Sequence, residues 1–240
     1  MLRSAKVIVF LGPPGSGKGT QADRLSSALS IPAISTGEML RRECRSGSAI
    51  GRAVQQIIAS GQLVSDDLIN RAVANRLRQQ DCEGGCILDG YPRTVPQARY
   101  LEKFLRMLNV PAPVVFDFEI PSEEIVSRLS RRRQCDECGR IFTLAATDAS
   151  LLCDRDGSRL VQRADDDPDT IRQRLRIYRK NAAKLIRYYQ TRDYHPICAT
   201  RTPAQICDDL LNVLALETSA AVLPGTNVAV PTGYADLAFS

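Results

Sequence analysis

A glycine-rich run between an apolar stretch and an amphipathic stretch constrains this chain more than any other feature. The run is Gly12-Pro-Pro-Gly-Ser-Gly-Lys-Gly-Thr20, and it follows the apolar, mostly β-branched residues 7–11, which are typical of a buried strand. Residues 21–30 place apolar side chains on one helical face. Strand, glycine-rich turn and helix form the context that a phosphate-binding loop requires, because backbone N–H groups and the helix N-terminus then point at an anion.

The residue after the loop lysine departs from the general pattern. Lys18 supplies a positive charge for the β- and γ-phosphates of a nucleoside triphosphate. The general loop, G-x-x-x-x-G-K-[ST], then offers a hydroxyl to Mg²⁺, but here Gly19 holds that position and Thr20 follows. Asp89, which ends a predicted strand at 86–90, is therefore the candidate that orients water on Mg²⁺. A plain cap or turn role for Asp89 is the alternative.

Recurring strand and helix patterns predict the fold class. A second strand is expected at 114–120, and Ser122 with the acids after it predicts the capped start of a helix. Alternating strands and helices predict an α/β fold, a P-loop NTPase-type parallel sheet with helices on both faces. The segments 35–64 and 131–166 are interpreted as inserts. We expect one domain over 1–217 and a flexible tail over 218–240, with a β-addition peptide as the less favoured interpretation of the tail.

Composition excludes several classes of protein. The chain has 240 residues and is 44% hydrophobic, enough for a substantial core, and its net charge is a modest +5. That charge suits an anionic ligand but lacks the dense basic surface of a nucleic-acid binder. No apolar run reaches membrane-spanning length and no cleavable signal is expected, so the sequence predicts neither a membrane nor a nucleic-acid partner. Five of the eight cysteines are scattered and are interpreted as small buried hydrophobic residues. The exported, disulfide-rich class does not suit a P-loop protein of this size, so a reducing, cytoplasmic location is expected.

The other three cysteines form a candidate metal site. Cys135 and Cys138 make one C-x2-C knuckle, and Cys153 with Asp156 repeats its shape. Three thiolates and one carboxylate suit a closed, structural Zn²⁺ site that would staple a segment too small for its own core. Asp154 as the fourth ligand and three free thiols without metal are the alternatives. A zinc-ribbon nucleic-acid module is disfavoured because interleaved aromatics are missing.

Three further motifs carry a family resemblance. They are Ser35-Thr-Gly-Glu-Met-Leu-Arg-Arg42, which capping alone could also explain, then Gly61-Gln-Leu-Val-Ser-Asp-Asp67, and Asp89-Gly-Tyr-Pro-Arg-Thr94 with Gln97 after it. Together with the glycine-rich loop, they resemble the nucleoside monophosphate kinases, adenylate kinase above all. The motifs occur in that family's order, and the resemblance covers about residues 5–216.

The resemblance implies two nucleotide sites. For AMP, it implies that Thr36 touches the adenine, Arg41 and Arg93 bind the phosphate and Gln97 reads the adenine edge. Backbone and neighbouring residues complete that pocket: Gln62, Leu63, Val64, Gly90, Tyr91, Pro92, Arg163 and Arg174. For ATP, it implies contacts from Gly15, Ser16, Gly17, Lys18, Gly19 and Thr20, a stacking Arg128, a phosphate clamp at Arg132, and adenine-side contacts from Ile141, Phe142 and Thr202.

The activity that the resemblance implies is reversible transfer from MgATP to AMP, giving two ADP, by a monomer. The acceptor phosphate is already anionic, so no general base is needed, and catalysis is positioning plus neutralisation of charge. The residues implied are Lys18, Arg93, Arg132, Arg163 and Arg174. The inserts are expected to close over the monophosphate and the triphosphate, and so exclude water. A long zinc-type lid argues against a UMP/CMP kinase. A GTP:AMP kinase and a non-catalytic nucleotide sensor with a zinc-stabilised lid are the remaining alternatives.

Overall fold

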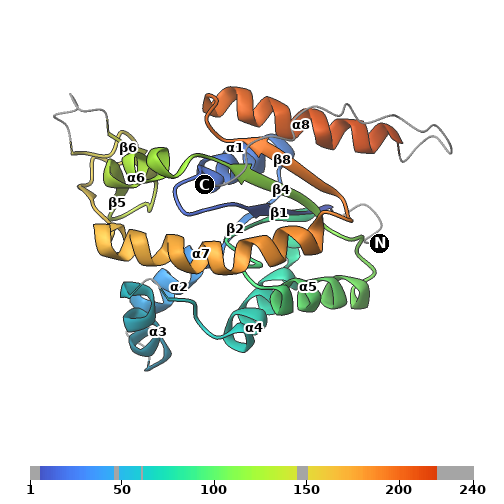
Figure 1. Cartoon of the computed structure of the whole chain (residues 1–240), viewed down its shortest axis with the longest axis horizontal. Coiled ribbons are helices and arrows are strands. Elements are labelled where there is room, and N and C mark those ends of the chain that lie inside the picture. Colours follow the sequence, from blue (N-terminus) through green and yellow to red (C-terminus); the bar gives the residue numbers. More distant parts are fainter. Residues whose placement is uncertain (1–5, 46–48, 61, 145–150, 221–240) are drawn as a thin grey trace.

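A five-stranded, fully parallel sheet forms the centre of the molecule (Figure 1). The computed structural model describes residues 6–45, 49–60, 62–144 and 151–220. The strand order is β2-β3-β1-β4-β8, with the glycine-rich loop leaving the middle strand. The strands are β1 (Lys6–Leu11), β2 (Ala33–Ser35), β3 (Gly85–Asp89), β4 (Val114–Glu119) and β8 (Tyr194–Cys198). The α/β fold with a parallel sheet is therefore confirmed.

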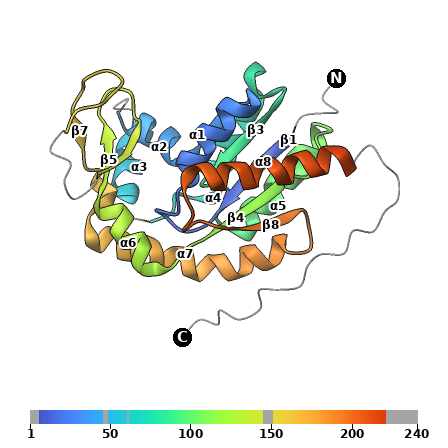
Figure 2. The same cartoon turned by 90° about the horizontal axis from the view of Figure 1, so that it is seen from above.

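Helices cover both faces of this sheet (Figures 1 and 2). On one face lie α1 (Lys18–Leu29) and α8 (Pro203–Ala220), and on the other lie α4 (Asp66–Leu77), α5 (Val95–Met107) and α7 (Pro168–Tyr189). The remaining helices are α2 (Thr36–Arg45), α3 (Ala49–Ala59) and α6 (Ser122–Ser130), with short 3₁₀ turns η1 (Gln80–Cys82) and η2 (Ala164–Asp166). No helix of the described ranges is both long and apolar enough to cross a bilayer.

The central strand β1 is apolar without alternation because both of its faces are buried. Val7, Val9 and Leu11 pack into the cluster beneath α5 and α7, whereas Ile8 and Phe10 pack into the cluster beneath α1 and α8. A strand buried on both faces needs apolar side chains on both. This burial holds the glycine-rich loop on the least exposed strand of the sheet.

The two segments interpreted as inserts have different architectures. Residues 35–64 contain α2 and α3. Residues 131–166 contain a three-stranded antiparallel sheet in the order β6 (Ile141–Thr143), β5 (Arg132–Cys135) and β7 (Leu160–Val161). The buried hydrophobic cluster of this segment consists of Cys135, Cys153 and Leu160. Three buried side chains make a minimal core, which agrees with a segment that needs a staple.

Of the two helix starts for which the sequence predicts a serine cap, one differs in the structure and one agrees. Pro121, not Ser122, precedes α6, and the Ser122 hydroxyl instead accepts a hydrogen bond from Arg179 at 2.9 Å. The prediction of a Ser122 cap was wrong because a partner distant in sequence takes that hydroxyl. Ser35 does cap α2, accepting from the Glu38 N–H at 3.4 Å. Residues 221–240, most of the expected tail, lie outside the described residues.

Candidate active site

The glycine-rich loop and its lysine lie at the carboxyl end of β1, the edge of a parallel sheet where ligands bind. Lys18 Nζ donates to the carbonyl oxygens of Gly12 and Pro13 at 2.9 and 2.7 Å and to Ser16 Oγ at 3.3 Å. Gly15 has φ +83°, and a Cβ there would lie 2.8 Å from Leu129 Cγ. Only glycine therefore fits at this turn.

Lys18 is held in a strained electrostatic setting. Its pKa falls to about 8, first because of burial; the negative charge of Asp89 opposes the shift, and the positive charges of Arg93 and Arg174 add to it. A buried ammonium that faces two guanidinium groups is poorly compensated. An anion placed between these three groups would neutralise them together. The positive charge around the loop thus favours the binding of a phosphate group.

Asp89 faces the position where the general loop pattern has a hydroxyl. A Cβ on Gly19 would lie 3.7 Å from Asp89 Oδ2. The carboxylate thus lies in contact distance of the place where a serine Cβ would stand. Oxygen ligands, often through water, are what Mg²⁺ prefers. The donor set at this point fits a magnesium ion held by the nucleotide phosphates and by Asp89.

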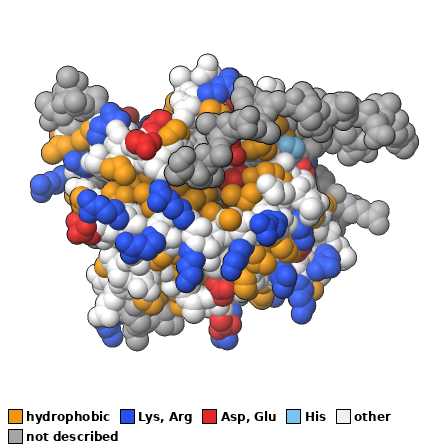
Figure 3. Space-filling model, in the orientation of Figure 1, with side chains coloured by type: hydrophobic (Ala, Val, Ile, Leu, Met, Phe, Trp, Pro, Cys, Tyr) orange, Lys and Arg blue, Asp and Glu red, His pale blue; other side chains and the backbone are white. Residues whose placement is uncertain are grey.

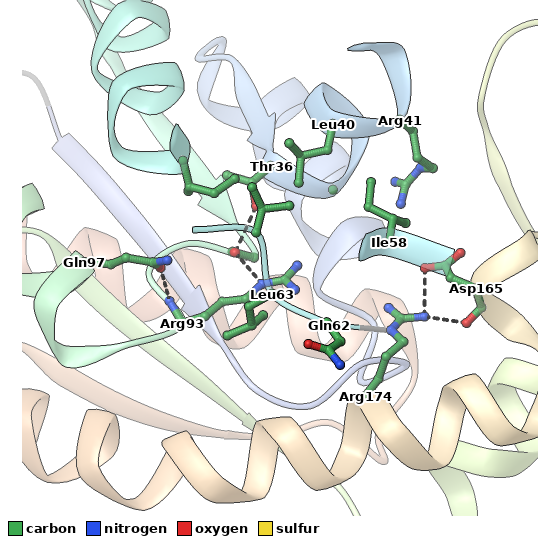
Figure 4. A pocket seen from close by; sticks show the side chains of 14 residues that line it. Thr36, Leu40, Arg41, Ile58, Gln62, Leu63, Arg93, Gln97, Asp165 and Arg174 are labelled. Atoms are coloured by element: carbon green, nitrogen blue, oxygen red, sulfur yellow. Dashed lines mark hydrogen bonds and ion pairs between the residues drawn. The ribbon is translucent and has the colours of Figure 1, made fainter. Parts of the chain in front are cut away.

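A cavity of about 70 Å³ lies beside the loop, between the first insert and the end of β3 (Figure 4). Its apolar walls come from Leu40, Ile58, Val64 and Ile69, and Gln97 is buried in its lining. Thr36, Gly37, Arg41, Gln62, Leu63, Gly90, Arg93, Asp165 and Arg174 complete the lining. Apolar walls, one buried amide and several guanidinium groups suit a flat base that carries a phosphate.

The turn after β3 orients Arg93 in this cavity. Arg93 Nε and Thr36 Oγ1 both donate to the Gly90 carbonyl, at 2.8 and 2.9 Å (Figure 4). A Cβ on Gly90, which has φ +77°, would lie 3.0 Å from Arg93 Nη2 and 3.1 Å from Thr36 Oγ1. The close approach of three groups therefore requires glycine. It fixes the Arg93 guanidinium at the mouth of the cavity.

Three arginines lie where this cavity meets a much larger cleft. Arg41, Arg93 and Arg174 line both spaces. The cleft, of about 1010 Å³, is lined by the glycine-rich loop and also by Arg128, Arg132, Arg163 and Ile141. Two adjoining spaces with arginines at their junction can bring two phosphate chains end to end.

Two carboxylates that were not predicted as site residues hold Arg132 and Arg174 in place. Arg132 Nε donates to Asp166 Oδ2 at 2.7 Å, and Arg174 Nη1 pairs with Asp165 Oδ2 at 3.0 Å. Burial alone would raise the pKa of Asp165, but the surrounding arginines, Arg174 first, hold it below its usual range. Their signal in the sequence was the acidic run that follows Arg163 and Ala164, inside an arginine-rich segment.

Many basic residues near the site are only solvated. Figure 3 shows lysine and arginine side chains spread along the face that α7 covers. Arg172, Arg176 and Lys180 are exposed on this helix, whereas Arg174 turns into the cleft. Arg163 also lines the cleft, where burial and then Arg41 and the other arginines lower its pKa. On α7, the basic residue that lines the cleft is thus Arg174, the one that the resemblance implies.

Some predicted contacts lie elsewhere in this structure. Phe142 packs beside the small cluster of the second insert, and the Arg140 guanidinium lies 5.4 Å above its ring. Thr202 caps α8, accepting from the Gln205 N–H at 3.4 Å, and is exposed outside the cleft. Arg128 does flank the loop, held by Glu124 at 2.5 Å and by the Ala199 carbonyl at 2.9 Å.

The four candidate metal ligands converge. One ligand atom each from Cys135, Cys138, Cys153 and Asp156 lies within 4.8 Å of the others. The Cys138–Cys153 Sγ distance is 3.7 Å, and Cys135 Sγ lies 3.4 Å from Asp156 Oδ1. Tetrahedral zinc with bonds of about 2.3 Å to sulfur and about 2.0 Å to oxygen needs separations of about 3.5–3.8 Å. Asp154 instead pairs with Arg140 at 2.8 Å. The set with Asp156 therefore fits zinc.

The comparisons with known proteins agree on one family. The family model described as "Adenylate kinase" matches residues 10–194. The adenylate kinase of Thermosipho africanus is 46% identical over 185 residues, which is 76% of this chain and 86% of that protein. That of Archaeoglobus fulgidus is 44% identical over 76% of this chain and 85% of its own length. That of Anaeromyxobacter dehalogenans is 46% identical over 78% and 88%.

Proposed function

This chain belongs to the adenylate kinase family, and we propose how its residues divide the reaction, the reversible transfer of a phosphoryl group from MgATP to AMP that gives two ADP. The loop over Gly15–Thr20 holds the β- and γ-phosphates of ATP, with Lys18 supplying charge where its own surroundings leave it uncompensated. Magnesium, when bound, would neutralise charge on the phosphate groups, and Asp89 would hold the ion through water.

AMP occupies the smaller cavity. Its adenine lies between the apolar walls, with Thr36 and Gln97 at the base, and its phosphate reaches Arg41 and Arg93. Gln62, Leu63 and Val64 close one side of this cavity. The acceptor oxygen is anionic, so the arginines need only position it in line and compensate the charge of the transferred group.

The observation that carries this assignment is the position of Arg41, Arg93 and Arg174 at the junction of the two spaces. A single-nucleotide sensor needs one phosphate site, whereas this junction serves two phosphate chains at once. Arg132 and Arg163 add charge from the second insert, which would close over ATP. Phe142 and Thr202 would contact the adenine of ATP only after the second insert closes or after the loop that carries Thr202 changes its conformation.

A donor and acceptor panel tests the assignment. We expect purified protein to form ADP from ATP and AMP, with lower rates for GTP as donor and for UMP as acceptor. Arg93→Ala should raise the barrier by about 3–5 kcal/mol, a loss of hundreds- to thousands-fold in kcat/KM. Arg71→Ala, which removes an exposed arginine of α4, is the matched control and should leave the rate unchanged. Equal rates for Arg93→Ala and the parent would refute the assignment.

The remaining assignments concern the whole chain. We propose that residues 1–217 form the kinase domain, that 35–64 and 131–166 move, and that 218–240 is dispensable. We also propose that Zn²⁺ staples the second insert through Cys135, Cys138, Cys153 and Asp156. None of the eight cysteines, all of which lie within the described residues, forms a disulfide, which supports the proposal of a reducing, cytoplasmic setting, and we propose that the protein is a monomer.

A further inference from the structure

The buried amide of Gln97 is held at both of its atoms. Its Oε1 accepts from the backbone N–H of Arg93 at 2.7 Å (Figure 4), and its Nε2 donates to Asp66 Oδ1 at 2.6 Å. Gln97 is 2% exposed and lines the acceptor cavity. Asp66 is the first residue of α4, 31 positions away in the sequence. A long-range contact therefore controls this side chain.

These two partners allow only one orientation of the amide. A backbone N–H can only donate, and a carboxylate can only accept. If the amide turned over, Oε1 would face the Asp66 carboxylate and Nε2 would face the Arg93 N–H, so both contacts would become repulsive. The orientation thus follows from the chemistry of the partners.

Asp66 itself is firmly held. Its other oxygen, Oδ2, accepts from Thr94 Oγ1 at 2.9 Å, and Thr94 caps α5 by accepting from the Gln97 N–H at 3.3 Å. The next turn of α4 adds Asn70, whose Oδ1 accepts from the Tyr91 hydroxyl at 2.7 Å. The start of α4 therefore holds the whole turn that carries Gln97. A carboxylate at this helix start is also favoured by the helix dipole.

We propose that Asp66 is a positioning residue that makes the acceptor site select a 6-aminopurine over a 6-oxopurine. The locked amide has one N–H and one oxygen lone pair left. These match adenine, which offers an acceptor at N1 and a donor at its 6-amino group. A 6-oxopurine offers the reverse pattern, a donor at N1 and an acceptor at O6, and meets two mismatches. The proposal rests on the proposed function, in which Gln97 reads the base of AMP.

The test compares AMP with inosine monophosphate, which differs from AMP only at this edge of the base. Both are used as acceptors with saturating MgATP, and the ratio of their kcat/KM values is measured. Asp66→Asn should reduce this preference for AMP about tenfold to a hundredfold, because an asparagine amide can also donate, so that only the Arg93 N–H still opposes a turned Gln97. Asp67→Asn, at the neighbouring exposed acid, is the control and should keep the parent ratio.

The ratio separates positioning from mere stability. A structural role for Asp66 would lower both acceptors in parallel, so an unchanged ratio in Asp66→Asn overturns the proposal. Asp66→Glu keeps a group that only accepts, and it should keep the preference even where the total rate falls. A preference lost equally in both variants would also overturn it.

The Gln97→Leu variant tests the underlying assignment separately. It should raise the KM for AMP and abolish the preference for AMP over inosine monophosphate. If Gln97→Leu leaves the KM for AMP unchanged, the proposed function of Gln97 fails, whatever Asp66 does. If Gln97→Leu behaves as expected and Asp66→Asn keeps the parent ratio, only the inference about Asp66 fails.

Discussion

Replacing Lys18 with methionine should change the pH dependence of this protein's stability. In the free protein, burial lowers the lysine pKa from 10.5 to about 8, with Arg93 and Arg174 adding to the shift. Between these two values the unfolded chain binds more protons than the folded one. The free energy of unfolding therefore increases as pH rises through this window. Below pH 8 the lysine is charged in the folded protein, which then carries the full cost of burying that charge.

The size of the effect follows from the shift. Linkage between the two pKa values gives a change of about 2 kcal/mol between pH 7 and pH 9.5. This is an upper value, because Lys18 borders an open cleft and keeps some water. The hydrogen bonds from Lys18 to the loop carbonyls of Gly12 and Pro13 add a term of the opposite sign. That term is nearly constant with pH, since a neutral amine still donates.

Urea unfolding at pH 7 and pH 9.5 isolates the charge term. The measured quantity is the difference in free energy of unfolding between the parent and Lys18→Met at each pH. As pH rises from 7 to 9.5, the parent should gain about 1–2 kcal/mol of stability relative to Lys18→Met. All other titrating groups occur in both proteins and cancel. A difference that stays constant within error, or that moves toward the methionine variant, would refute the idea of a poorly compensated lysine.

Three further changes test other parts of the molecule. Asp166→Asn should lower the free energy of unfolding by about 2–4 kcal/mol in urea, because two arginines lose a buried carboxylate; a loss near zero would contradict the pairing. Zinc should be present at about one ion per chain by elemental analysis, and Cys138→Ser or EDTA should remove it and lower the melting temperature; a metal-free, equally stable protein would rule out the staple. Gly15→Ala should abolish ATP binding in calorimetry, since the new Cβ clashes with Leu129; AMP binding should remain, and unchanged ATP affinity would argue against the loop assignment.

Local patterns predicted the parts of this site that depend on backbone conformation. The strand at Lys6–Leu11, the loop glycines and the turn at Gly90 all require residue types that are visible in a short window. The knuckles of Cys135 and Asp156 are likewise local, and the only long-range demand is that they meet.

Contacts between distant segments could not be predicted in the same way. Asp66 reaches Gln97 and Asp166 reaches Arg132 only because the fold brings their elements together. Nothing in the spacing of such acids distinguishes a partner of a buried amide or guanidinium from a solvated charge. Ser122 shows the same limit, since its hydroxyl binds Arg179 from α7 rather than capping its own helix.

If Arg132 and Arg174 bind phosphate as proposed, the carboxylates beside them are competitors within the protein. In the free enzyme Asp165 and Asp166 already hold Arg174 and Arg132, so an incoming phosphate would compete for these guanidinium groups with a partner that is always present at high local concentration. This competition lowers the affinity for substrates, and it lowers the affinity for ADP by the same means. Weaker retention of product shortens the time that a finished ADP stays bound. The two acids therefore set an upper limit on affinity and, through it, favour rapid turnover in both directions.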